Sequence, residues 1–164
     1  MLCMEDPMNL KHVFVVVPAA LCILGNWTAN AGQTINEAGA LGLVVDKWDE
    51  KEVEKGHKLV DYAGRYVAIP DDPAGLKNTG DCKGKYEYMP DSSWKGAGTC
   101  IVTFKGGDTL QESWEEGSQL KEYSYKFTGG TGKYEGAKGE GTYTSENLTD
   151  TLGGGKYKGQ IVLP

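Results

Sequence analysis

Hydrophobic and polar positions alternate most regularly between residues 82 and 104. If a turn is centred on Asp91, an antiparallel pairing brings Cys82 opposite Cys100 and Tyr88 opposite Trp94, while lysines and a glutamate fall on the other face. One register thus accounts for the alternation, an aromatic pair and a cysteine pair, which is typical of a β-hairpin. We predict a hairpin closed by a Cys82–Cys100 disulfide. Two unpaired thiols are the alternative.

Short alternating segments continue on both sides of this hairpin. Between residues 109 and 116, strict alternation places Glu112 on the same face as Leu110 and Trp114,. About eight strands at hairpin spacing, with no long helix, predict an all-β fold, namely a closed antiparallel β-barrel. Further strands are expected at 40–45, 59–69, 122–127 and 156–163, with turn residues at 70–75 and 105–108,.

The segment 47–55 departs from this pattern, because most of its positions are charged and its apolar residues are Trp48 and Val53. It lacks the apolar stripe of an amphipathic helix. We therefore expect a solvated connector that holds one helical turn.

Glycines are dense between Phe127 and Tyr143, in the sequence FTGGTGKYEGAKGEGTY. An interior glycine weakens a helix by about 1 kcal/mol relative to alanine, whereas glycine suits the tight turns and sharply coiled strands of a barrel. We expect a strand that ends near Phe127, a turn over 128–132 and a second strand over 139–143.

Within this segment, Phe127, the run 129–132, Tyr134 and Gly139 resemble a signature shared by plant allene oxide cyclases, dirigent proteins and their bacterial secreted relatives. The resemblance implies an allene oxide cyclase barrel-like, or calycin-like, fold. It also implies a shaped cavity, since allene oxide cyclases steer ring closure of a fatty-acid epoxide and dirigent proteins steer the coupling of phenolic radicals. The motif residues are structural in those families, so the resemblance assigns no catalytic residue here.

Residues 1–31 have the pattern of a secretory signal peptide: Lys11, an apolar stretch over 13–24, and the small-x-small ending Ala29-Asn30-Ala31,. We expect cleavage after Ala31, a single barrel domain over 32–164 and a secreted or periplasmic location without stable membrane insertion. An uncleaved tethering helix is the alternative. The sequence leaves open whether translation starts at Met1 or Met8.

The formal net charge is −6, charges of both signs are scattered, and Arg65 is the only arginine. Nucleic acid is therefore excluded as a partner, because phosphate binding needs a basic stripe. His57 is the only histidine outside the leader, which excludes a zinc site with several imidazoles,. The glycine run also lacks the Lys-Ser/Thr of a phosphate-binding loop. We expect no metal and no cofactor.

The candidates that remain are aromatic side chains and one carboxyl group inside the barrel. Glycines share the inward faces of the strands with these aromatic residues and add no side-chain volume. The sequence therefore leaves open whether the interior is a filled core or a pocket. We predict that the barrel binds a small apolar or aromatic molecule. The alternative is a cofactor-free cyclase or isomerase in which Glu112, the one catalytic candidate, polarises a hydrophobic substrate. The sequence does not decide between these functions, and it leaves the ligand and the oligomeric state open. The predicted ligand-binding residues are Tyr86, Tyr88, Trp94, Glu112, Trp114, Tyr123 and Tyr125.

Overall fold

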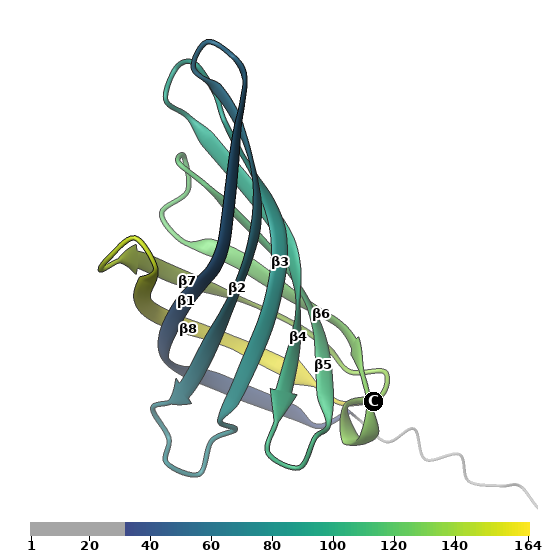
Figure 1. Cartoon of the computed structure of the whole chain (residues 1–164). Coiled ribbons are helices and arrows are strands. Elements are labelled where there is room, and N and C mark those ends of the chain that lie inside the picture. Colours follow the sequence, from purple (N-terminus) through teal and green to yellow (C-terminus); the bar gives the residue numbers. More distant parts are fainter. Residues whose placement is uncertain (1–31) are drawn as a thin grey trace, which may run out of the picture.

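Eight antiparallel strands form a closed barrel in the computed structural model, which describes residues 32–164 (Figure 1). Each strand pairs with its neighbours in sequence, and the last strand pairs with the first. The predicted closed antiparallel barrel is confirmed. The predicted signal peptide lies outside the described residues. The strands are β1 (Thr34–Glu54), β2 (His57–Pro70), β3 (Asn78–Tyr88), β4 (Trp94–Phe104), β5 (Thr109–Gly117), β6 (Tyr123–Gly130), β7 (Lys138–Asn147) and β8 (Leu152–Val162).

The β3–β4 hairpin has the register that the alternation predicts. Cys82 pairs with Cys100 and Tyr88 with Trp94 across the two strands. The two cysteines form a disulfide, as expected. Register and disulfide could both be predicted because one turn position satisfied every cross-strand pair at once.

Strand β1 corrects the prediction of a solvated connector over 47–55. Residues from Lys47 to Glu54 continue β1 and pair with β2, whereas β8 accompanies β1 only as far as Val44. The projecting part of β1 is therefore an edge strand whose residues are all exposed, and Trp48 alone among them packs against an aromatic ring of the wall, that of Tyr86, so the segment shows no regular apolar alternation. Its charges suit an exposed edge, since they oppose pairing with another chain. In Figure 1 the β1–β2 and β3–β4 hairpins extend beyond the rest of the barrel.

Apolar side chains fill one end of the barrel, which we call the packed end and define by Phe104, Leu110, Tyr134 and Ile161. The last three are fully buried, with 0% of each residue exposed. Tyr134 belongs to the short 3-10 helix η1 (Gly132–Tyr134), and its ring lies 4.3 Å from that of Phe104, between centroids. The expected glycine turn thus begins later than predicted, because β6 continues to Gly130 before η1 follows.

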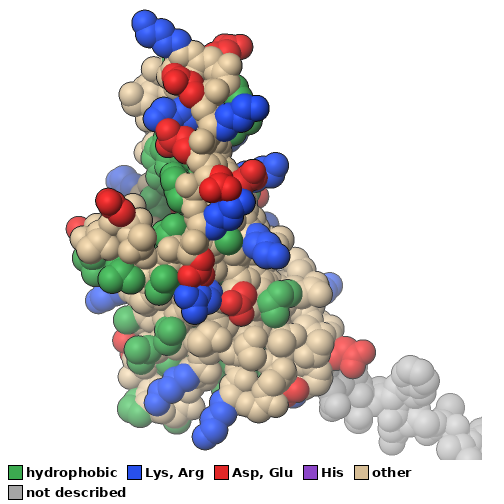
Figure 2. All heavy atoms as spheres, in the orientation of Figure 1, with side chains coloured by type: hydrophobic (Ala, Val, Ile, Leu, Met, Phe, Trp, Pro, Cys, Tyr) green, Lys and Arg blue, Asp and Glu red, His purple; other side chains and the backbone are tan. Residues whose placement is uncertain are grey.

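The outer surface carries mixed charges. Figure 2 shows basic and acidic side chains interspersed along the projecting hairpins, with hydrophobic side chains gathered on the left of the view below the hairpin tip. Among residues 32–164, no helix has the length and apolar character needed to cross a membrane.

Candidate ligand-binding cavity

A cavity of about 720 Å³ lies inside the barrel, and all eight strands contribute side chains to its wall. It extends toward the end of the barrel away from η1, which we call the open end and define by Trp48, Tyr86, Tyr88, Trp94 and Glu116. Along β5, the chain runs from Leu110 at the packed end to Glu116 at the open end. The interior is thus packed at one end and hollow at the other.

The glycines that face inward are covered by aromatic rings. A Cβ atom added to Gly84 or Gly98 would meet the indole ring of Trp114, and one added to Gly96 would meet the ring of Tyr86. These glycines therefore let large rings lie flat against the wall. The sequence left a filled core and an open pocket as alternatives. The rings fill the space beside the glycines, and a cavity remains next to the rings.

The aromatic rings form one continuous cluster along the cavity. Ring centroids lie 5.1 Å apart for Trp48 and Tyr86, and 5.6 Å apart for Tyr86 and Trp114. Deeper in the barrel, the rings of Tyr125 and Phe127 are 5.3 Å apart. All seven residues predicted to bind a ligand lie on the cavity wall, and their role in binding stays a prediction. Other residues of the wall were not predicted, among them Trp48, Tyr62, Tyr66 and Tyr143.

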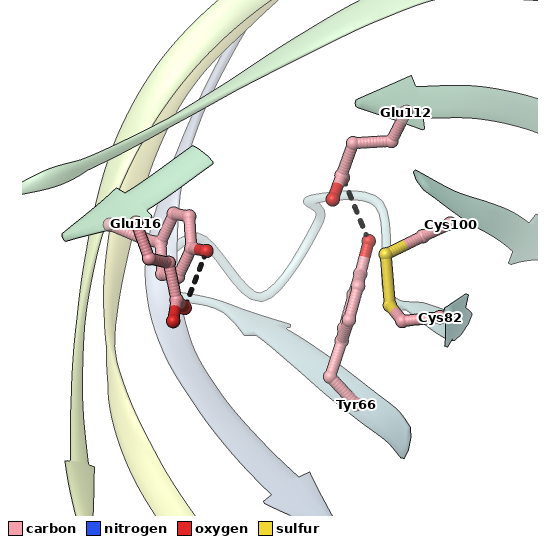
Figure 3. Close-up of a disulfide and its surroundings, with 6 residues drawn as sticks. Tyr66, Cys82, Cys100, Glu112 and Glu116 are labelled. Carbon is pink, nitrogen blue, oxygen red and sulfur yellow. Dashed lines mark hydrogen bonds between the residues drawn. A yellow bond between two sulfur atoms is a disulfide. The ribbon is translucent and has the colours of Figure 1, made fainter. Parts of the chain in front are cut away.

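Glu112 points into the barrel, with 9% of the residue exposed. Tyr66 on β2 donates its hydroxyl hydrogen to Oε2 of Glu112 at 3.1 Å (Figure 3). Burial raises the pKa of Glu112 to about 7, although the hydrogen bond from Tyr66 acts in the opposite direction. The pairing of β5 with β6 contains a β-bulge beside Glu112, and the extra residue is Thr128 on β6. The alternation along β5 is therefore unbroken, and Glu112 keeps its inward orientation.

Two further carboxyl groups, Glu37 and Glu116, lie largely buried in the cavity wall, where the sequence indicated one. Glu116 accepts hydrogen bonds from the hydroxyls of Tyr86 at 2.8 Å and Tyr143 at 2.7 Å. Glu37 accepts one from Tyr125 at 3.0 Å. Burial raises the pKa of both carboxyl groups. Extending the alternation of β5 beyond Trp114 would have found Glu116, whereas Glu37 precedes the residues assigned to the first strand.

Carboxylates at the cavity rim and on the outer surface have different partners. Asp46 forms an ion pair with Arg65 at 2.7 Å, and Glu122 forms one with Lys158 at 2.9 Å. Hydrogen bonds from these basic groups lower the pKa of both acids. His57 lies outside the cavity wall and bonds to Glu87. Within residues 32–164, no three His, Cys, Asp or Glu side chains are grouped so that they could hold a metal ion.

The fold is therefore an eight-stranded barrel, and it is similar to that of solved dirigent proteins, of which GePTS1 has the higher TM-score. The pterocarpan synthase dirigent protein GePTS1 is 12% identical, with 84% of this chain and 89% of that chain covered at a TM-score of 0.52. The pterocarpan synthase dirigent protein PsPTS1 is 14% identical, with 80% and 96% covered at a TM-score of 0.48. No model of a known protein family and no curated protein sequence matches this chain. The likeness to GePTS1 confirms the expected dirigent-like barrel as a fold.

Proposed function

We propose that the barrel binds a small molecule with an apolar or aromatic body in its internal cavity. The observation that carries this proposal is a cavity of about 720 Å³ lined by a continuous aromatic cluster. Ligand pockets commonly have volumes of about 300–1,000 Å³, and aromatic rings offer large apolar contact areas. GePTS1, named as a pterocarpan synthase, adds support by fold analogy alone,.

Binding can be tested with N-phenyl-1-naphthylamine, a neutral dye that fluoresces in apolar surroundings. Leu43 lines the cavity, so Leu43→Trp should reduce its volume and weaken dye binding by about fivefold, equivalent to ~1 kcal/mol,. Val67→Trp is the matched control, because Val67 is 47% exposed and absent from the cavity wall. Equal affinity in both variants would show that the dye binds elsewhere.

A cofactor-free cyclase or isomerase is the second candidate, and the environment of Glu112 favours it. A buried carboxyl group with a pKa of about 7 is suited to general acid or base catalysis near neutral pH,. Tyr66 fixes the orientation of this carboxyl group through its hydrogen bond. Glu112 would then polarise a hydrophobic substrate held against Trp114.

The base-catalysed ring opening of 5-nitrobenzisoxazole offers a generic test of this candidate. The base removes the proton from C3 and the N–O bond breaks, which gives a cyanophenolate and the protonated base. Because the corresponding cyanophenol is an isomer of the starting compound, the overall reaction is an isomerisation. We expect Glu112→Gln to abolish any acceleration, while Glu122→Gln on the surface preserves it. A rate equal to that of the Glu112→Gln variant would exclude Glu112 as a base toward this substrate.

We further propose that residues 1–31 direct export and are removed after Ala31. A disulfide within the barrel supports an oxidising compartment,. N-terminal sequencing of the exported protein should begin at Gly32-Gln33-Thr34. Recovery of the intact leader in a detergent-extracted fraction would contradict the proposal.

A further inference from the structure

The interior carboxyl groups have no basic side chain as a partner. Among the ion pairs of residues 32–164, none includes Glu37, Glu112 or Glu116. The two basic residues on the cavity wall are Lys47 and Arg65, and they bind Asp49 at 2.8 Å and Asp46 at 2.7 Å. Their side chains are 50% and 60% exposed, so both lie at the rim. The barrel interior therefore holds acidic groups that no basic side chain neutralises.

Buried hydrogen-bond acceptors on the wall remain unused. Tyrosine hydroxyls that lie beside the carboxyl groups already donate to them. Asn78 lines the cavity with 8% of the residue exposed, and its Oδ1, an acceptor, has no hydrogen-bond partner among the described residues. Tyr157, 7% exposed, also lines the cavity with an unpartnered hydroxyl, which can either donate or accept. A ligand that donates hydrogen bonds would complement this wall.

Aromatic rings surround the carboxyl group nearest to the open end. Glu116 is bonded to Tyr86 and Tyr143, and the Tyr86 ring lies 5.9 Å from Trp94 and 5.1 Å from Trp48, between centroids. The faces of such rings attract cations, and aromatic cages commonly recognise substituted ammonium groups. A cation at Glu116 would meet a carboxylate and two tyrosine hydroxyl oxygens, in a part of the cavity whose wall is aromatic.

From these observations we propose that the ligand is an organic cation, with an ammonium group at Glu116 and an apolar body that extends past Trp114 toward Phe127. The inference rests on the proposed binding function and names the chemical class of its ligand. It also predicts discrimination, because an anion would be repelled by the carboxyl groups and a neutral alcohol would gain no ionic contact.

Three compounds test the charge preference: phenethylammonium, 2-phenylethanol and phenylacetate. Each has a phenyl ring on a short alkyl chain, and their terminal groups are a cation, a neutral alcohol and an anion. Isothermal titration calorimetry at pH 8 and low salt should show the cation binding about tenfold more tightly than the alcohol, with the anion weakest. Glu116→Gln should reduce the cation to the affinity of the alcohol. Glu122→Gln should keep the preference, because Glu122 lies on the surface and is paired with Lys158.

The outcomes separate this inference from the proposed function. If the alcohol binds as tightly as the cation to the unmodified protein, the cation proposal is wrong and small-molecule binding stands. If none of the three compounds binds and the neutral dye also fails, both proposals are wrong. The comparison on the unmodified protein decides the question even if Glu116→Gln does not fold.

Discussion

The two ends of the barrel use the same inward-facing positions in different ways. At the packed end, Leu110, Tyr134 and Ile161 are each 0% exposed and fill the interior. At the open end, Trp48 is 42% exposed and the rings stand around a cavity. Both ends belong to the same strands, so strand pairing alone does not decide whether the interior is filled.

Two features account for this difference. The helical turn η1 inserts Tyr134 at the packed end, whereas the open end has no such element among the described residues. Carboxyl groups also line the cavity, and burying them costs free energy unless they are protonated or hydrogen-bonded. The packed end is therefore expected to supply stability, and the open end to supply binding.

The largest effect is expected from truncating the packed end. Leu110→Ala should lower the free energy of unfolding by about 4 kcal/mol, because it removes a fully buried side chain and leaves a void,. Leu43→Ala at the cavity wall is the matched control and should cost much less, since it enlarges an existing space. Urea unfolding measures both, and equal losses would refute the division between the ends.

Removing the disulfide should have the next largest effect. The Cys82–Cys100 bond joins residues 18 positions apart and closes the hairpin that projects at the open end. Replacing both cysteines with alanine should cost about 3 kcal/mol on the chain-entropy account of disulfides. Urea unfolding measures the free energy of unfolding of the variant and of the chemically reduced protein, and both are compared with the oxidised protein. A stability unchanged from that of the oxidised protein would show that the hairpin is held by its backbone pairing alone.

Much of the barrel could be predicted because alternation and turn chemistry are local signals. The cross-strand pairs of β3–β4 were compatible with one register, which the sequence therefore predicted. The inward orientation of Glu112 was predicted from its alternation with Leu110 and Trp114. The projecting part of β1 could not be found this way. All its residues are exposed, so backbone pairing with β2 defines the strand without leaving an apolar pattern.

The acid–tyrosine pairs of the cavity were beyond the sequence for a related reason. Glu37 and Tyr125 are 88 residues apart, and Glu112 and Tyr66 are 46 apart. Such pairs depend on barrel closure and stagger, which bring distant strands to opposite walls of one cavity. Their chemistry therefore becomes visible only in the assembled barrel.

The pH dependence of stability sharpens the contrast between interior and surface acids. Burial holds the folded-state pKa of Glu112 at about 7, above its ordinary value of 4.5. Its contribution to stability is therefore fully present below pH 4.5 and is lost as the pH rises through 7, by about 3 kcal/mol,. Glu37 and Glu116, whose pKa values are also raised, should add to the same trend.

Glu112→Gln should flatten this dependence, and Glu122→Gln should not, because the pKa of Glu122 is lowered at the surface. Carbon-detected NMR titration reports the carboxyl group directly. The groups that interact with it are the Tyr66 hydroxyl and the Glu37 carboxyl, so the apparent pKa includes their influence. A pKa near the ordinary value of 4.5 would contradict a buried site.

The smallest effect is expected at the glycine turn that leads into the packed end. Gly132 has φ +58°, a conformation that disfavours side chains, and an added Cβ would meet the carboxylate of Asp108. Gly132→Ala should therefore cost about 1 kcal/mol. Gly42→Ala on β1 is the matched control: no atom lies within 4 Å of its added Cβ, and its φ is not positive. That control should be neutral or slightly stabilising, because alanine restricts the unfolded chain. Thermal unfolding of the two variants compares them directly, and equal melting temperatures would mean that the turn before Tyr134 tolerates a side chain and does not constrain the packed end.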